Sequence, residues 1–380
     1  MMTTTETGFG DVRATPPAAR SANERRAHDL AKRAPYEWHL YPASEFRAHA
    51  KAWQGLRKCT SRPPVLDAIF IETLLEHFGH GDEMLAICGA THAPHAMAIL
   101  RQRRPGVWET FQASQGPLSP WIFDSHTSYE KVLPSLMRAL PGLPLIVAVT
   151  QKDPAIHPRP ATNGRLIVLD HFRTGRIFVD RSHEEYWQSR HKKIRYEMGR
   201  RLRRLSELGI EPALDVIRDR ADVAAAIDTY ADIESRGWKA AIGTAVRGDD
   251  RQRRFYDDLL QKLAAAGAAR IYRYRFGDRV VAMQLCVESD DTLVFLKTTY
   301  LEEYGRYSPG LLMKRAILED IFRRATIKRI EFYGPLLPWQ EHWVDDVRTL
   351  YHVNYYRWPW LARMHSAHGA VRLKVKRVEN

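Results

Sequence analysis

The chain has 380 residues, of which 44% are hydrophobic and 10% aromatic, so it can bury a sizeable core and is not disordered by composition. Its formal net charge of +13 favours an anionic partner such as a phosphorylated cofactor, an RNA or a membrane surface, without choosing among them. The three cysteines are too few and too far apart for a disulfide scaffold, and no apolar run approaches the roughly 20 residues that a membrane-spanning helix needs. The sequence therefore predicts a cytoplasmic protein.

The chain begins with a lead segment without hydrophobic periodicity, and a first lobe with such periodicity follows it. Residues 1–35 are rich in Thr, Ala, Arg and Pro and are predicted to be a disordered lead rather than a secretory signal. Residues 36–180 form the first predicted lobe. Its expected elements are a strand at 36–41, helices at 45–58 and 65–78, strands at 84–88, 95–101 and 107–113, a helix at 128–140 and a strand at 143–150.

The same order returns in a second predicted lobe, residues 181–365, which is followed by a basic tail at 366–380. It opens with a long, strongly basic helix at 183–208. The elements expected after it are a strand at 212–217, helices at 222–236 and 250–266, strands at 270–276, 280–287 and 292–299, a helix opening at Gly310, and a strand at 328–333. Even Ala96-Met97 and Ala282-Met283 fall at the same point of the two series.

This order predicts an α/β fold built on mixed sheets. Three strands joined by short loops make an antiparallel meander, and the following strand–helix–strand segment adds a parallel neighbour. The fold class expected is therefore two tandem lobes joined by the basic helix. Two ordinary α/β domains of similar order by chance remain the alternative, and the helix is either a solvated connector or a binding element.

The chemistry is concentrated where the third strand of the second lobe feeds a loop and a helix. Ser308-Pro309-Gly310 stands at the start of that helix, where backbone N–H groups have no internal partner and the helix dipole attracts anions. We expect Ser308 to cap the first turn, and Gly310, Leu311 and Leu312 to offer N–H groups to a pyrophosphate. Lys314 and Arg315 lie one turn further on.

Motifs in the second lobe resemble one known family. They are Arg200-Arg201-Leu202-Arg203-Arg204-Leu205, Glu234-Ser235 with Trp238-Lys239, Phe255-Tyr256, Gly277 to Met283, Lys297 with Tyr300, Ser308-Pro309-Gly310 and Tyr333-Gly334. In this order they resemble the acetyltransferase domain of the CelD/BcsL-like family of the GNAT superfamily. That family is similar in fold to the Fem peptidoglycan aminoacyltransferases, which carry two tandem GNAT lobes. The likeness covers about residues 182–357, and it is weaker over the first lobe.

The resemblance implies an acyltransferase that moves an acyl group from acyl-CoA, with acetyl-CoA as the first choice, to a small-molecule, saccharide or amine acceptor through an amine or hydroxyl. It further implies a role in polysaccharide or cell-envelope metabolism. Lys297 and Ser308 join Gly310, Leu311, Leu312, Lys314 and Arg315 as donor-binding candidates, and Trp238, Lys239 and Tyr300 are acceptor-side candidates. The catalytic candidates are Glu302, Glu341 and His342 as bases and Tyr304 and Tyr333 as acids or orienting groups.

Two departures from the family pattern keep other functions open. Leu301 stands where the family has an aspartate, and Pro338-Trp339-Gln340-Glu341-His342-Trp343 lacks the family's lysine. One alternative is a Fem-like transferase whose donor is aminoacyl-tRNA, favoured by the net charge and the basic helix. The other is a non-catalytic GNAT scaffold that binds nucleic acid or a protein partner.

Two further patterns bear on cofactors and surfaces. His77-x-x-His80 with Asp82-Glu83, and His92-x-x-His95, resemble metal-ligand pairs, but neither has a second pair nearby, so no metal is expected. The segment from Tyr351 to Lys376 mixes aromatic and basic residues. It is predicted as a strand at 350–357 and a packed helix, with contact to a membrane or RNA as the alternative.

Overall fold

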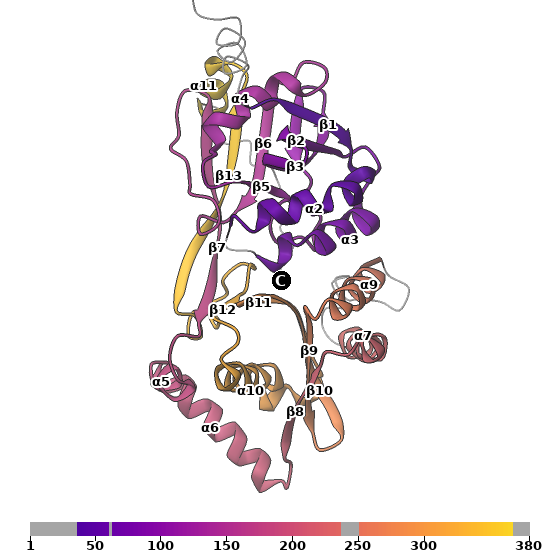
Figure 1. Cartoon of the computed structure of the whole chain (residues 1–380). Coiled ribbons are helices and arrows are strands. Elements are labelled where there is room, and N and C mark those ends of the chain that lie inside the picture. The colour runs from indigo at the N-terminus through magenta and orange to yellow at the C-terminus, as the bar shows by residue number, and fades with distance from the viewer. Residues whose placement is uncertain (1–35, 61–62, 237–250, 368–380) are drawn as a thin grey trace, which may run out of the picture. The chain divides into compact units, whose positions relative to one another are not determined.

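The computed structural model describes residues 36–60, 63–236 and 251–367 (Figure 1). Its first half contains the predicted series together with short 3-10 helices at Ala43–Glu45 and Pro64–Leu66. Asp67 caps the second helix by accepting the Ile69 N–H, and Gly106, with φ +76°, turns the second meander strand into the third. The elements are β1 (Trp38–Pro42), α2 (Phe46–Arg57), α3 (Ala68–Phe78), β2 (Met84–Ala90), β3 (Ala93–Arg104), β4 (Val107–Thr110), α4 (Tyr129–Ala139) and β6 (Ile146–Lys152).

The second half repeats the series, as predicted. Asp219 caps the first helix of the pair, and Gly277, with φ +58°, makes the first meander turn. The elements are β8 (Pro212–Ile217), α7 (Arg220–Ser235), α9 (Arg251–Ala265), β9 (Ala269–Phe276), β10 (Arg279–Ser289), β11 (Thr292–Tyr300), a 3-10 helix η3 (Glu302–Tyr307), α10 (Pro309–Arg324) and β12 (Arg329–Glu331). The echo of Ala96-Met97 and Ala282-Met283 is structural, because both pairs lie on the middle strand of a meander.

All the strands belong to one mixed sheet. Its order is β1-β2-β3-β4-β6-β13-β7-β12-β11-β10-β9-β8, where β7 is Leu166–Phe178 and β13 is Asp346–Tyr356. A short strand, β5 (Trp121–Phe123), pairs with β3 off this path. Each half has an antiparallel meander followed by a helix and a parallel strand, since β4 pairs with β6 and β11 with β12 in parallel. The predicted mixed α/β class is confirmed.

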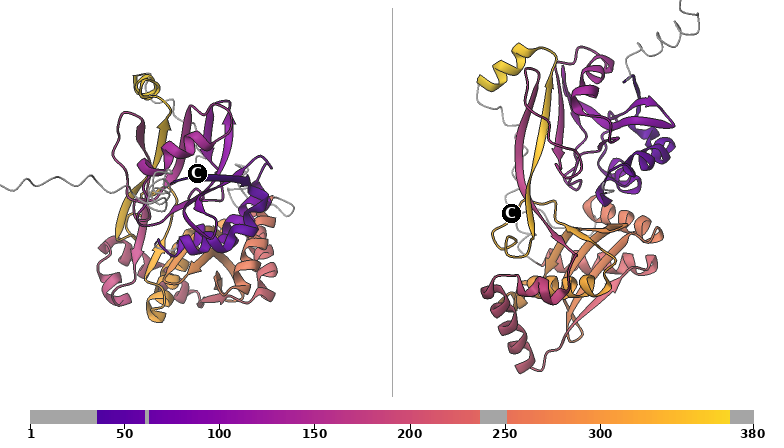
Figure 2. Two further views of the ribbon diagram at one scale, coloured as in Figure 1. Left: turned by 45° about the horizontal axis from the view of Figure 1, so that its top comes forward. Right: turned by 60° about the vertical axis from the view of Figure 1, so that its left-hand side comes forward.

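The centre of the sheet is built by an exchange of strands. β7 follows β6 in the chain but pairs with β12 through Arg176–Phe178, and β13 follows β12 but pairs with β6 through Tyr351–Tyr356. The two exchanged strands also pair with each other, from Asp346↔Arg176 to Tyr355↔Leu166, and run side by side in both views of Figure 2. Neither β5 nor β7 is predicted by the sequence pattern.

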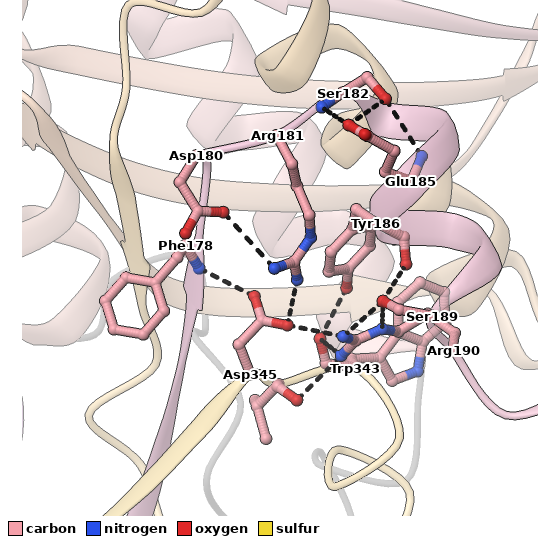
Figure 3. Close-up of polar contacts among 11 residues, drawn as sticks. Phe178, Asp180, Arg181, Ser182, Glu185, Tyr186, Ser189, Arg190, Trp343 and Asp345 are labelled. Carbon is pink, nitrogen blue, oxygen red and sulfur yellow. Dashed lines mark hydrogen bonds and ion pairs between the residues drawn. The ribbon is translucent and has the colours of Figure 1, made fainter.

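The predicted single helix over 183–208 is wrong, because the chain breaks into α5 (His183–Gln188) and α6 (Lys192–Glu207). Arg190 lies in the break and turns its guanidinium away from the helix axis. It donates to the Trp343 and Val344 carbonyls at 3.1 and 2.9 Å and to Asp345 at 2.6 Å (Figure 3). Asp345 also accepts from Arg181 and from the Phe178 N–H, so one carboxylate joins the end of β7 to the start of β13.

Two cores cover the faces of the second half of the sheet. On one face, α7 and α9 pack over Met283, Leu285 and Val294, and this core continues into α2 and α3, for example through Phe70 and Phe255 with ring centroids 6.1 Å apart. On the other face, α5, α6 and α10 pack over Cys286 and Phe295. A third core lies around α4 and β6. No helix in the described part of the chain combines the length and apolarity needed to span a bilayer.

Candidate active site

A fork opens in the sheet between β11 and the chain that follows β12. The two strands pair only over Thr292–Val294 and Arg329–Glu331, whereas β11 runs on to Tyr300 beside β10. Beyond Glu331 the chain bends toward β7 instead, where the Phe332 N–H donates to the Gly175 carbonyl at 3.3 Å. Residues 295–300 of β11 therefore do not pair with β12, and the two strands diverge beyond Val294.

A bulge in β11 lies at the fork. Leu285 pairs with Lys297 and Cys286 with Phe295, so Leu296 is the extra residue. Buried Gln284 stabilises the bulge, because its amide nitrogen donates to the Lys297 carbonyl at 3.0 Å and its oxygen accepts from the Thr298 hydroxyl. The bulge thus re-aims the last residues of β11 along the open arm of the fork.

The N-terminus of α10 follows the open end of β11 after one 3-10 segment. Ser308 is left-handed, with φ 51°, and its hydroxyl does not form the predicted cap. Its carbonyl instead accepts from the Leu311 and Leu312 N–H groups at 3.0 and 3.1 Å. Of the three amides predicted to bind a pyrophosphate, only that of Gly310 does not bond to Ser308. Gly310 lies against Tyr300, since a Cβ built on it would be 3.5 Å from Tyr300 Cδ1.

Lys314 lies between the two arms of the fork on the α10 face. Its ammonium is 5.9 Å from the Phe295 ring of β11, 4.8 Å from Phe332 and 4.3 Å from Trp339. Burial lowers the pKa of Lys314 to about 7. Arg315 points elsewhere, over the Trp187 ring at 5.2 Å. Lys314 is thus buried and Arg315 half-buried, and their predicted contacts with donor phosphates stay a prediction.

A buried carboxylate–guanidinium cluster lies at the base of the fork. Glu331, paired with Val294, is 3% exposed and accepts from Arg348 Nη2 at 2.7 Å. Arg348 donates to both oxygens of Asp153 at 2.8 and 2.6 Å and stacks over the Tyr333 ring at 5.5 Å. Burial raises the pKa of Glu331 to about 7 although Arg348 opposes the shift. Burial also raises the pKa of Tyr333 well above its ordinary value, so its hydroxyl keeps its proton at neutral pH.

A second polar cluster lies further along β11, on the α7 face. The Lys297 ammonium donates to Glu234 at 3.1 Å and to Gln252 at 3.2 Å, and it lies 5.8 Å from the Tyr256 ring. The Glu234 carboxylate is fully buried and also accepts from the Tyr230 hydroxyl at 3.3 Å. Three motifs of the sequence resemblance, at Glu234, Tyr256 and Lys297, thus meet in one place.

The other predicted site residues are spread around this region. Glu302 is exposed at the start of η3, and the Tyr304 ring packs edge-on against Phe276 at 5.7 Å. Glu341 is half-exposed and pairs with Arg173 at 3.4 Å, and the exposed His342 has its ring 5.9 Å from that of His191. Trp238 and Lys239 lie outside the described residues. The structure thus brings Gly310 and Tyr300 together with the fork, and adds Glu331, Arg348 and Asp153, which the sequence analysis missed.

The His77/His80 pattern is divided between two different contacts. His77 bonds to Asp258 at 3.0 Å, whereas His80, Asp82 and Glu83 place one ligand atom each within 4.8 Å of one another. The Glu83 carboxylate accepts the His80 and Gly81 N–H groups at 2.9 and 3.0 Å, so it closes a turn. Its oxygens are committed to backbone groups.

A polar pocket of about 460 Å³ lies at the other end of β11, near the β10–β11 turn. Asp67 and Gln54 line it from the first half of the chain, and Arg270 and Glu288, 2.5 Å apart, line it from the second. It does not include the fork or the α10 N-terminus. We take the fork as the candidate site because it combines the α10 N-terminus with the buried Glu331–Arg348 cluster. The pocket is separate from it.

Comparisons with known proteins agree with this geometry. Residues 192–341 match a family model described as the acetyltransferase (GNAT) domain. No curated protein gives a significant sequence match. Among solved structures, the C-terminal domain of a protein named as a lysylphosphatidylglycerol synthetase, from Agrobacterium fabrum, is 12% identical with a TM-score of 0.52, covering 85% of this chain and 99% of that one.

Two further solved structures share the fold. FemX is 10% identical with a TM-score of 0.51, covering 86% of this chain and 99% of that one. A protein of unknown function from Bacteroides thetaiotaomicron is 9% identical with a TM-score of 0.52, covering 85% and 100%. At such identities the likeness concerns the fold alone. Each half of the chain repeats the same series of elements in one mixed α/β fold, and residues 192–341 match the model of the GNAT acetyltransferase domain.

Proposed function

We propose that the chain is an acyltransferase that uses acyl-CoA, acetyl-CoA first, to acylate an amine or hydroxyl. The observation that carries this proposal is the fork between β11 and β12, with the Gly310 amide at the following helix N-terminus. A helix N-terminus attracts the anionic part of a donor, and backbone groups of the strand beside it can be positioned to receive a thioester. Holding donor and acceptor together there supplies most of the rate enhancement.

The donor must enter past Lys314 and Trp339. Phe295 and Phe332 belong to the two arms of the fork, and the Lys314 ammonium lies between them under the Trp339 ring. Trp339 is 42% exposed. Donor binding on the α10 face therefore requires the Trp339 ring to move outward, and the Lys314 side chain with it.

Glu331 is the base that this geometry favours. The acceptor amine attacks the thioester carbonyl, its nitrogen forms the new C–N bond, and the C–S bond breaks to release the thiolate. The amine proton passes to the Glu331 carboxylate and from there to the thiolate. A carboxyl with a pKa near 7 can both accept and return that proton at neutral pH. Glu302, Glu341 and His342 stay predictions as alternative bases, and Tyr304 and Tyr333 as acids.

A second donor, aminoacyl-tRNA, is favoured by one specific observation. α6 is a helix of 16 residues with five exposed or half-exposed arginines, at positions 195, 200, 201, 203 and 204, on the same half of the chain as the fork. Such a helix suits a nucleic-acid backbone, and the Fem-like resemblance implies such a donor. This reading predicts tRNA binding that weakens steeply with salt.

Release of free thiol from a panel of acyl-CoAs, with amine and hydroxyl acceptors, tests the proposal. We expect turnover with at least one donor and its loss in Gly310→Trp, because the new side chain would meet Tyr300 and cover the helix N-terminus. Gly55→Trp is the matched control, since a Cβ on Gly55 meets no atom within 4 Å. Thiol release that survives Gly310→Trp would contradict this donor site, and transfer from aminoacyl-tRNA alone would select the second donor.

The finer sequence-based predictions belong to this proposal. They are membership of the CelD/BcsL-like family, a role in polysaccharide or cell-envelope metabolism, a cytoplasmic location, and acceptor contacts from Trp238, Lys239 and Tyr300. The meeting of Glu234, Tyr256 and Lys297 supports the family, because the resemblance rests on those three positions. The division into lobes at 36–180 and 181–365 also remains a proposal.

A further inference from the structure

One end of the sheet carries exposed aromatic and apolar side chains with arginines around them. Here β4 and β6 begin and β13 ends, since Val107 pairs with Ile146 and Ile146 with Tyr356. β3 ends and β7 begins at the same end, through Arg104↔Val107 and Tyr355↔Leu166. The helix α11 (Pro359–Ala367) follows from this point and contacts β13.

Large apolar side chains are exposed at this end. Trp358 is 38% exposed, Trp360 52% and Leu143 61%. The two indole rings are stacked, with centroids 5.9 Å apart and an angle of 10° between their planes. Arg357 binds the Leu143 loop to them by donating to the Pro144 carbonyl at 2.6 Å, and its N–H donates to the Leu145 carbonyl at 2.9 Å. We call Leu143, Trp358 and Trp360 the tryptophan patch.

Four exposed arginines surround the tryptophan patch; three lie at or next to backbone groups that bond to the segments carrying it, and the fourth lies on α11. Arg104 lies two residues before Gly106, whose carbonyl accepts the Leu145 N–H. Arg138 follows Met137, whose carbonyl accepts from the Arg357 side chain. The Arg165 carbonyl accepts the Tyr356 N–H, and Arg363 lies on α11. Across the described residues, none of these four guanidinium groups forms an ion pair. The segments 103–107, 138–146, 163–166 and 356–364 contain no aspartate or glutamate.

We propose that this end of the molecule docks on an anionic phospholipid surface, with the tryptophan patch at the headgroup level and the four arginines on lipid phosphates. Tryptophan is enriched at the membrane interface because its ring is apolar with one polar N–H. A basic rim adds electrostatic attraction to anionic lipid. The protein lies on one side of the surface and contacts it through this end of the sheet.

The basic helix α6 fits such a surface less well. Its one large exposed apolar residue is Tyr196, and the next one, Leu208, lies 12 positions on, at the C-cap beyond the end of the helix. Glu197 pairs with two of its arginines, Arg200 at 2.9 Å and Arg201 at 3.4 Å. α6 therefore offers charge without a shared apolar face, and it serves as the internal control.

Co-sedimentation of the full chain with vesicles tests the proposal. We expect binding to vesicles of phosphatidylcholine with phosphatidylglycerol, little binding to phosphatidylcholine alone, and weakening by salt. Arg104→Gln with Arg363→Gln should lower partitioning about 30-fold, at about 1 kcal/mol per arginine and 1.4 kcal/mol per factor of ten. Trp358→Ala with Trp360→Ala should lower it by at least about tenfold. Both pairs of positions are exposed, so unchanged thermal unfolding is expected.

The α6 pair Tyr196→Ala with Arg203→Gln should bind vesicles as the unmodified protein does. Equal binding to both kinds of vesicle would overturn the proposal, and so would patch variants that bind normally. Loss of binding in the α6 pair alone would assign the surface to α6 instead. Binding of single-stranded RNA but not vesicles, lost in the arginine pair, would replace the lipid by nucleic acid. Since no acyl transfer is measured, these results are independent of the donor proposal.

Discussion

Replacing Arg348 by methionine tests the buried cluster at the base of the fork. Its guanidinium donates to Asp153 at 2.8 and 2.6 Å and to Glu331 at 2.7 Å, and all three side chains are less than a tenth exposed. Methionine has a similar length but leaves two facing carboxyl groups without a cation. We expect the free energy of unfolding at pH 8 to fall by about 3–5 kcal/mol, the usual cost of breaking a buried ion pair.

The loss of unfolding free energy in Arg348→Met should be larger at high pH than at low pH. In the native protein the pKa of Glu331 is already raised from 4.5 to about 7, and removal of Arg348 raises it further. Between 4.5 and the folded-state pKa the folded protein binds more protons than the unfolded chain, so its stability falls as pH rises through that window. Arg348→Met should therefore be less destabilising at pH 5, where Glu331 is protonated, than at pH 8.

Urea denaturation followed by tryptophan fluorescence at pH 5 and pH 8 measures both effects. Arg200→Met is the control, because Arg200 is 59% exposed and its partner Glu197 25% exposed, and such surface pairs contribute about 0–1 kcal/mol. A loss for Arg348→Met no larger than that of the control, or one of equal size at the two pH values, would refute this account of the cluster.

Three further substitutions separate chemistry from packing. Glu331→Gln keeps an acceptor for Arg348, so we expect normal thermal unfolding. We expect its kcat to be about 10²- to 10⁴-fold lower, and its pH–rate profile to lack the change near pH 7 that the Glu331 carboxyl produces. An unchanged kcat would exclude Glu331 as the base. Lys314→Met should raise the free energy of unfolding at pH 7 by about 1–4 kcal/mol. In the unmodified protein, stability should rise between pH 7 and 10.5, because over that range Lys314 binds more protons in the unfolded chain than in the folded one; Lys314→Met should lack this rise. A lower free energy of unfolding in Lys314→Met would contradict the expected stabilisation. Gly175→Ala puts a Cβ 2.5 Å from Val344 Cγ1 and should cost about 1–3 kcal/mol by denaturation, whereas Gly164→Ala, with no atom within 4 Å, should change stability by less than about 0.5 kcal/mol.

Periodicity predicts the elements that have one buried face and fails where polar residues are used inside the sheet. β10 alternates between the two cores and is predicted within a few residues. β7 is not, because Asp170, Arg173 and Arg176 interrupt its apolar residues while still pairing along β13. The break between α5 and α6 also has no periodic signal, since it depends on Arg190 reaching carbonyls more than 150 positions away.

The candidate site divides in the same way. Gly310 and Tyr300 are separated by one loop, so local reasoning places them together. Asp153, Glu331 and Arg348 lie on or beside three strands that only the exchange of β7 and β13 makes neighbours, and no local pattern reports that exchange. One signal was present nonetheless. Glu331 is a carboxylate next to Ile330 in the strand predicted at 328–333, and a carboxyl group that becomes buried is uncommon without a partner.

The exchange of strands has a consequence for how the protein is made. β6 has emerged from the ribosome long before Asp346–Tyr356, the segment that covers its free edge, has been translated. Until then the first half of the nascent chain presents an open row of backbone donors and acceptors, the kind of edge on which aggregation starts. Completion of the first lobe must therefore await the synthesis of β13, after the whole series of the second half, and a piece limited to 192–341 would lack the β7 partner of β12 altogether.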